Sequence, residues 1–177
     1  MSNYGPPHLQ RRSLLKLGIA SAVVLAVAGG AVALMQPGLQ SNGKLTEDSR
    51  LIFTRAGQAI LAGTLPAEAG PNQIAINALL DRVDAFIAGT PEHVQAELSQ
   101  LLGLLGTAAG RRGVVGLSPG WHDATVPEIA AAFQAMRVSS VSLRVQAYQA
   151  LHDIVSASYF SGQESWAVLG YPGPRVI

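Results

Sequence analysis

Cysteine is absent from the 177-residue sequence, and charged residues are scarce. Without cysteine the chain forms no disulfide, no thiolate zinc site, no cysteine nucleophile and no cysteine-ligated iron–sulfur cluster of its own. Only 13% of the residues are charged, about half of the roughly 25% typical of soluble domains, whereas 49% are hydrophobic. We therefore expect part of the protein surface to be covered by something other than water.

Acidic residues are missing from the first 46 positions, because the first carboxylate in the chain is Glu47. Arg11, Arg12 and Lys16 stand in this acid-free part. When these three are set aside, nine of the 12 basic residues remain beyond Ala33 against 11 acidic residues, which leaves a net charge of −2. Such a balance gives the folded part no basic surface, so the sequence predicts no nucleic-acid partner.

An uncharged, mostly apolar run of 19 residues, 17–35, follows this basic flank. As a helix it would be about 28 Å long, close to the roughly 30 Å of a bilayer core. Ala31 and Ala33 place small residues at the two positions that a signal peptidase inspects. Residues 1–35 are therefore expected to be either an export signal cut after Ala33 or a membrane anchor helix.

The flank RRSLLK resembles the twin-arginine translocation (Tat) motif, in which two arginines are followed by any residue, two hydrophobic residues and often lysine. Arg11, Arg12, Leu14, Leu15 and Lys16 match that pattern. The Tat pathway exports proteins that have already folded in the cytoplasm. We favour a Tat leader over the alternative of an ordinary N-terminal anchor whose positive flank stays in the cytoplasm.

Beyond the leader, the sequence predicts a linker at residues 36–45 and an all-α domain at residues 46–177. The linker is expected because QPGLQSNGK is rich in turn-forming residues and its few apolar residues have no period. Apolar residues then recur at three- and four-residue steps, which predicts a bundle of about five helices followed by an irregular tail. The five helical segments are 47–61, 76–89, 92–105, 126–136 and 139–160.

Local signals mark several helix starts: Thr46 and Thr90 as N-caps, and a capping box from Thr125 to Glu128. In contrast, GRRGVVGLSPG at residues 110–120 has four glycines and a proline, which predicts a loop or a short extended piece. The side chains expected to be buried, in chain order, are Leu51, Ile52, Ile60, Leu61, Ile76, Leu79, Leu80, Val83, Phe86, Ile87, Val94, Leu98, Leu101, Leu102, Leu105, Ile129, Ala132, Phe133, Met136, Val141, Val145, Tyr148, Leu151, Val155 and Tyr159.

Residue patterns for catalysis are not found in the sequence. None of the four histidines belongs to a metal-binding pattern, and the serines lack the GxSxG nucleophile elbow. Asp81 and Asp84 are read as part of a solvated helix face, and no glycine-rich phosphate loop is present. We therefore predict no catalytic, cofactor-binding or metal-binding residue in this chain, and we expect it not to be an enzyme in its own right.

Aromatic residues concentrate at the C-terminal end, where four of the ten in the chain fall within 13 residues. Tryptophan and tyrosine favour interfaces, and the glycines and prolines here prevent an ordinary helix. We predict a docking tail whose contact residues are Tyr159, Phe160, Trp166, Leu169, Gly170, Tyr171, Pro172, Gly173 and Pro174. The alternative is that the tail folds back over its own bundle, with Trp166 as a core plug.

The tail YFSGQESWAVLGYPGP resembles the C-terminal signature of the gluconate 2-dehydrogenase subunit 3 family. The resemblance covers about 20 residues at the C-terminal end, together with the general form of the leader. It implies a noncatalytic small subunit beside a large FAD-dependent dehydrogenase of the glucose–methanol–choline class. It also implies a haem c subunit as a common third component that passes electrons to the respiratory chain.

This resemblance gives the leader a function. A flavoprotein acquires FAD while it folds in the cytoplasm, so it needs an exporter of folded cargo or a companion that has the signal. We expect this chain to be the Tat escort and stabilising subunit of a periplasmic alcohol, sugar or sterol dehydrogenase, attached to the inner membrane if the leader is retained. The alternative is a stand-alone, membrane-tethered helical protein of the cell envelope without a redox partner.

Overall fold

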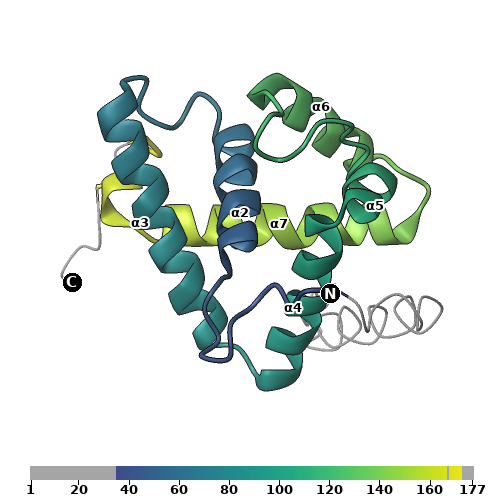
Figure 1. The fold of residues 1–177 in the computed structure, drawn as a ribbon. Coiled ribbons are helices and arrows are strands. Elements are labelled where there is room, and N and C mark those ends of the chain that lie inside the picture. Colours follow the sequence, from purple (N-terminus) through teal and green to yellow (C-terminus); the bar gives the residue numbers. More distant parts are fainter. Residues whose placement is uncertain (1–34, 167, 173–177) are drawn as a thin grey trace, which may run out of the picture.

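A computed structural model describes residues 35–166 and 168–172, and 66% of the structure is helical. No strand occurs in the described residues, so the predicted all-α class is confirmed, while the predicted signal or anchor helix lies outside them. The described part contains six α-helices, a π-helical turn and a 3-10 turn (Figure 1). In chain order these are α2 (Glu47–Ile60), α3 (Ala69–Ala88), α4 (Glu92–Gly106), α5 (Ala108–Gly110), η2 (Arg111–Val115), α6 (Val126–Arg137), α7 (Ser142–Phe160) and η3 (Gln163–Ser165).

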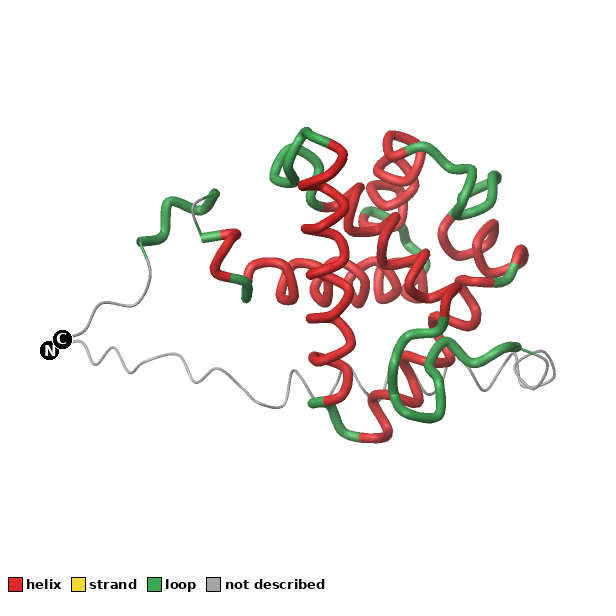
Figure 2. Tube along the Cα trace, turned by 60° about the vertical axis from the view of Figure 1, so that its left-hand side comes forward, coloured by secondary structure: helices red, strands yellow, loops and turns green. Residues whose placement is uncertain are grey.

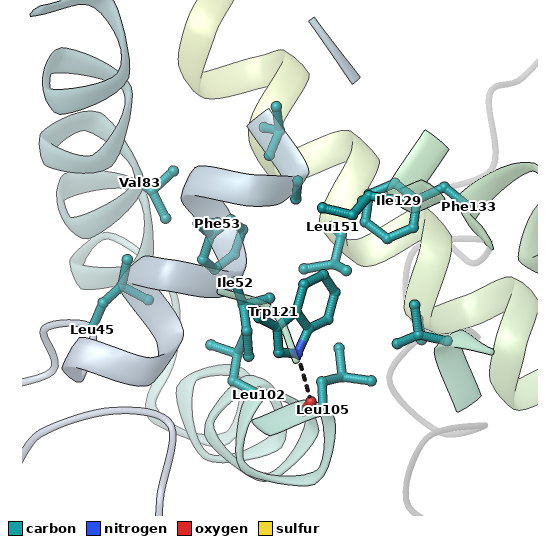
Figure 3. Packing of buried hydrophobic residues seen from close by; sticks show 14 of the residues in the cluster. Leu45, Ile52, Phe53, Val83, Leu102, Leu105, Trp121, Ile129, Phe133 and Leu151 are labelled. Carbon is teal, nitrogen blue, oxygen red and sulfur yellow. Dashed lines mark hydrogen bonds between the residues drawn. The ribbon is translucent and has the colours of Figure 1, made fainter. Parts of the chain in front are cut away.

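Helices α2 and α7 hold the domain together, because each packs against several others. α2 contacts α3, α4, α6 and α7, and α7 crosses the molecule from α6 to α3 (Figure 1). Where these helices meet, Ile52, Phe53, Val83, Leu151 and Trp121 form part of one apolar core (Figure 3). Trp121 lies in a turn, not in a helix, and its indole Nε1 donates a hydrogen bond of 2.9 Å to the Leu105 carbonyl.

Two of the three predicted helix caps are confirmed. Thr46 accepts a hydrogen bond from the Ser49 amide at the start of α2, and Thr125 and Glu128 form both halves of the capping box of α6. Thr90 is not a cap: α4 follows Pro91, and no side chain caps that end. The Thr90 hydroxyl instead donates to the Ile87 carbonyl at 2.7 Å, at the end of α3.

The predicted loop at residues 110–120 is wrong in its first half. After Thr107, whose extended backbone ends α4, residues 108–115 form a short helical turn and a π-helical turn, which ends at Gly116 with φ 82°. Gly110 is required there because a Cβ would collide with the Leu104 carbonyl. The Arg144 guanidinium then donates from Nε to the Val114 carbonyl at 2.9 Å, so a side chain from α7 satisfies the end of the turn.

Some side chains predicted to be buried lie on the surface. Phe86, Val94 and Val141 are 45%, 36% and 54% exposed. The face of α3 that packs on α2 and α7 is narrower than the stripe read from the sequence, so Phe86 falls at its edge. Val141 is outside α7, which begins at Ser142, later than the predicted Ser139.

The segment predicted to be a linker packs closely on the helices. Leu39 and Leu45 are both buried, and their backbones form an isolated antiparallel bridge. The Leu45 amide donates to Asp84 Oδ1 at 2.9 Å, and Asp84 also pairs with Arg50 at 2.8 Å. Asp84, read from the sequence as a solvated carboxylate, therefore holds this segment against α3.

Candidate functional site

The candidate site is the C-terminal tail, which we define as residues 161–172. Figure 2 shows it projecting from the end of α7, away from the bundle. Helix α7 ends at Phe160, and Gly162 leads into the 3-10 turn η3. No residue from Ser165 to Pro172 is charged. The tail therefore has a polar base at Gln163 and Glu164, followed by an uncharged, mostly apolar segment.

Arg82 of α3 fixes the base of the tail. Its Nε donates a hydrogen bond to the Ser158 carbonyl, and its Nη1 pairs with Glu164 Oε1, both at 2.6 Å. The pKa of Glu164 lies below its ordinary 4.5, chiefly because its own backbone amide donates to the carboxylate; burial opposes this shift and Arg82 adds to it. A Cβ on Gly162 would come within 2.6 Å of Glu164 Oε1 and 2.8 Å of Arg82 Nη1, so a larger residue there would push the ends of both side chains aside.

Tyr159 and Phe160, both predicted docking residues, belong to the helical domain. Tyr159 is 4% exposed, and its hydroxyl donates to the Thr64 carbonyl at 3.3 Å. Phe160 is partly buried against the core, edge-on to Tyr159 with ring centroids 5.2 Å apart. Tyr159 therefore has no surface to offer a partner, and it ties the end of α7 to the turn before α3.

Trp166 and Tyr171, by contrast, come together in the tail. The Tyr171 amide donates to the Trp166 carbonyl at 2.9 Å, and the two rings meet edge-on at 5.2 Å. Gly170 between them has φ 65°, a left-handed conformation that favours glycine. A hydrogen bond across five residues, a left-handed glycine, an apolar contact and a following proline are the features of a Schellman-type turn, so the tail has its own local shape.

The apolar side chains around this turn lie open to solvent. Val168, Leu169 and Tyr171 are 54%, 56% and 47% exposed, and Pro172 is exposed as well. Trp166 is partly buried, so it is neither a complete core plug nor a fully free side chain. The turn therefore presents a row of apolar groups of the kind that is usually buried at an interface.

Helix α3 adds apolar surface next to the tail base. Phe86 follows Arg82 by four residues, so the two share one edge of the helix. Ile74, which is 70% exposed, precedes Arg82 by eight residues on the same helix. Helix α3 thus has two exposed apolar side chains in addition to those of the tail.

The other predicted site residues lie outside the described part of the chain. These are Gly173 and Pro174 of the docking tail and Arg11, Arg12, Leu14, Leu15 and Lys16 of the Tat motif. The helices from residue 47 to 160 include none long and apolar enough to cross a membrane.

Two histidines of the described surface lie beside aspartates. His152 Nδ1 lies 3.0 Å from Asp153 Oδ1, and His122 lies 3.7 Å from its neighbour Asp123. In residues 35–166 and 168–172, no three histidine, aspartate or glutamate side chains gather as metal ligands would.

Sequence reasoning missed the Arg82–Glu164 pair. The two residues are 82 positions apart, and a single arginine on an amphipathic helix gives no sign of its partner. The one available signal was the apolar surroundings of Arg82, because a charge beside a buried stripe needs a compensating group.

Comparison of the chain with protein-family models, with curated proteins and with solved structures finds no match.

Proposed function

We propose that this protein is the noncatalytic small subunit of an FAD-dependent dehydrogenase of the glucose–methanol–choline class, which it escorts through the Tat pathway and stabilises. The observation that carries the proposal is the exposed apolar turn from Trp166 to Tyr171 at the end of a helical domain. FAD would belong to the large partner subunit, and a haem c subunit would complete the complex. The Tat motif at Arg11 and Arg12 would direct the complex to the periplasm.

The shape of the tail supports a docking role. A turn held by a backbone hydrogen bond and a left-handed glycine is already ordered before binding. Pre-ordering lowers the entropy lost on association, which otherwise costs about 0.5–1.5 kcal/mol for each immobilised side chain. An apolar segment that is rigid and exposed is thus better suited to a partner than a disordered one of equal composition.

The docking proposal is tested by placing a charge in the turn. We expect Leu169→Asp to weaken co-purification with the flavoprotein at least tenfold, because a carboxylate would be buried without a partner at the interface. Leu169 is 56% exposed in this chain, so the melting temperature should hardly change. Val138→Asp is the matched control, because Val138 is 66% exposed in the turn after α6, and this variant should bind normally.

The escort proposal is tested at the leader. Replacing Arg11 and Arg12 by lysine should leave both this chain and the flavoprotein in the cytoplasm, as shown by cell fractionation and FAD fluorescence. If the flavoprotein still reaches the periplasm, the escort role is wrong. If export fails but Leu169→Asp binds normally, the leader assignment stands and the docking assignment is wrong.

The partial burial of Trp166 favours a second candidate, a stand-alone membrane-tethered protein whose tail covers its own bundle. A chain ending at Ser165 keeps the Arg82–Glu164 pair and distinguishes the two. A self-covering tail lowers the melting temperature when removed. A docking tail leaves it nearly unchanged and abolishes the complex.

A further inference from the structure

The segment between the leader and α2 is seated on the domain from its first residues. We call residues 36–46 the neck. The Gly38 amide donates to the Ser99 carbonyl at 3.0 Å, and the Leu39 amide donates to Ser99 Oγ at 3.1 Å, both on α4. The Gly38 carbonyl accepts from the amide of Thr46 at 3.1 Å and from its hydroxyl at 3.0 Å. The neck is thus fixed to α4 through Ser99 and closed on itself at Thr46, the N-cap of α2.

Glycine allows the neck and α4 to touch through their backbones. A Cβ on Gly38 would collide with the Cβ of Leu102, and a Cβ on Gly103 would collide with the Gln36 carbonyl. Leu39 adds an apolar anchor, because it is only 7% exposed. Contact with the domain therefore begins at Gln36 and not at the first turn of α2.

The position of this contact bears on the cleavage site after Ala33. Two residues, 34 and 35, separate Ala33 from Gln36, and fully extended they span about 7 Å. An extended peptide is recognised through its main-chain hydrogen bonds, so its backbone must be free of other partners. The third residue after this cut is Gln36, whose carbonyl lies against Gly103 of α4, and the fifth and sixth are Gly38 and Leu39, which are hydrogen-bonded to Ser99.

We propose that folding of the neck protects the bond after Ala33, so that the leader is retained as a membrane anchor. This inference rests on the proposed Tat leader, because only a protein that folds before export presents a completed neck to the signal peptidase. The apolar run ends at Met35, one residue before the neck. The domain would then lie against the headgroup layer, which is about 5–8 Å thick on each side of the bilayer core.

The protection has a magnitude that can be measured. Cleavage requires the neck to open, and opening breaks the two hydrogen bonds from Gly38 and Leu39 to Ser99 and the two that Thr46 donates to the Gly38 carbonyl. Four hydrogen bonds of ordinary strength, lost together, correspond to a fraction of open molecules of at most about 1 in 100. We therefore expect cleavage of the folded chain to be at least about 100-fold slower than cleavage of the same sequence without the domain.

The test uses the purified full chain in detergent micelles with purified signal peptidase, read by intact mass. The wild type should remain at its full 177 residues, and a synthetic peptide of residues 10–45 should be cut after Ala33. A variant with six glycine and serine residues inserted between Met35 and Gln36 should be cut at nearly the peptide's rate. The matched control has the same insertion between Pro66 and Ala67, both exposed before α3, and should resist like the wild type.

Each result decides the matter. Rapid cleavage of the folded wild type overturns the proposal, and so does an intact peptide, because the bond would then resist for reasons unrelated to the neck. An intact spacer variant overturns it as well. Fractionation of cells separates this from the proposed function: a chain absent from the periplasmic side refutes export, whereas an exported chain shortened after Ala33 refutes only retention.

Discussion

Replacing Arg82 by methionine should destabilise the protein by about 2 kcal/mol, more than any change to its partner Glu164. Methionine keeps much of the length of the aliphatic stem but removes every hydrogen bond of the guanidinium. The bond to the Ser158 carbonyl at 2.6 Å is charge-assisted and contributes about 1.5–3 kcal/mol. The pair with Glu164 adds less than about 1 kcal/mol, because the Glu164 side chain is 54% exposed and screened by water.

A buried nitrogen of the same guanidinium reduces the loss of stability expected for Arg82→Met. Arg82 Nη2 is buried and makes no hydrogen bond within the described residues, and removing such a group recovers about 1 kcal/mol or more. The sum of these opposing contributions is the 2 kcal/mol expected for Arg82→Met. Glu164→Gln, which loses only the charge of the exposed partner, should cost under about 1 kcal/mol.

Urea unfolding of the two single variants and the double variant measures the cost of each substitution and the coupling energy between the two sites. The coupling energy between the two sites should be below about 1 kcal/mol, with the slope of unfolding against urea unchanged. The pKa of Glu164 is lowered in the folded protein, so its contribution is full above its ordinary 4.5 and is lost as the pH falls below that value. A cost for Glu164→Gln equal to that of Arg82→Met would refute the assignment of Ser158 as the main partner.

Three further changes have expected results. Trp121→Phe should cost about 1–3 kcal/mol in urea unfolding, because it removes the indole hydrogen bond to Leu105 and leaves a small cavity. Thr125→Val should cost about 1 kcal/mol of unfolding free energy at pH 7, because it removes the helix cap. Hydrogen bonds from Thr125 lower the pKa of Glu128, so the part of this cost that comes from the hydroxyl bond to the Glu128 carboxylate should be lost as the pH falls below 4.5 and Glu128 is protonated. Gly170→Ala should disfavour the tail turn by about 1 kcal/mol through its φ of 65°, without a steric clash. NMR should then show loss of contact between the two aromatic rings of the tail at an unchanged melting temperature.

Features encoded by neighbouring residues could be predicted from the sequence. The caps at Thr46 and Thr125 depend on groups three residues away, and the structure has both. The last helix was predicted to end at Phe160, where α7 ends, because glycine follows two residues later. Most of the buried residues of α3 and α4 could also be predicted, because the period of an apolar stripe depends only on helix geometry.

Features that depend on distant residues could not be predicted. The neck contains turn-forming residues, and only the close approach of Gly38 to α4 makes it part of the domain. The π-helical turn persists through Gly113 because Arg144, about 30 positions later, binds its last carbonyls. For the candidate site, composition identified the aromatic tail, but it could not separate the buried Tyr159 from the exposed Tyr171.

The contacts that Arg82 and Asp84 make from α3 have a consequence for the spacing of the two ends of the described domain. Arg82 and Asp84 are two residues apart, so their side chains leave the helix on opposite flanks. One binds the base of the tail and the other binds the neck. A single helix therefore sets the distance between the neck and the base of the tail. A flexible tether of the same composition would let that distance vary with every thermal fluctuation.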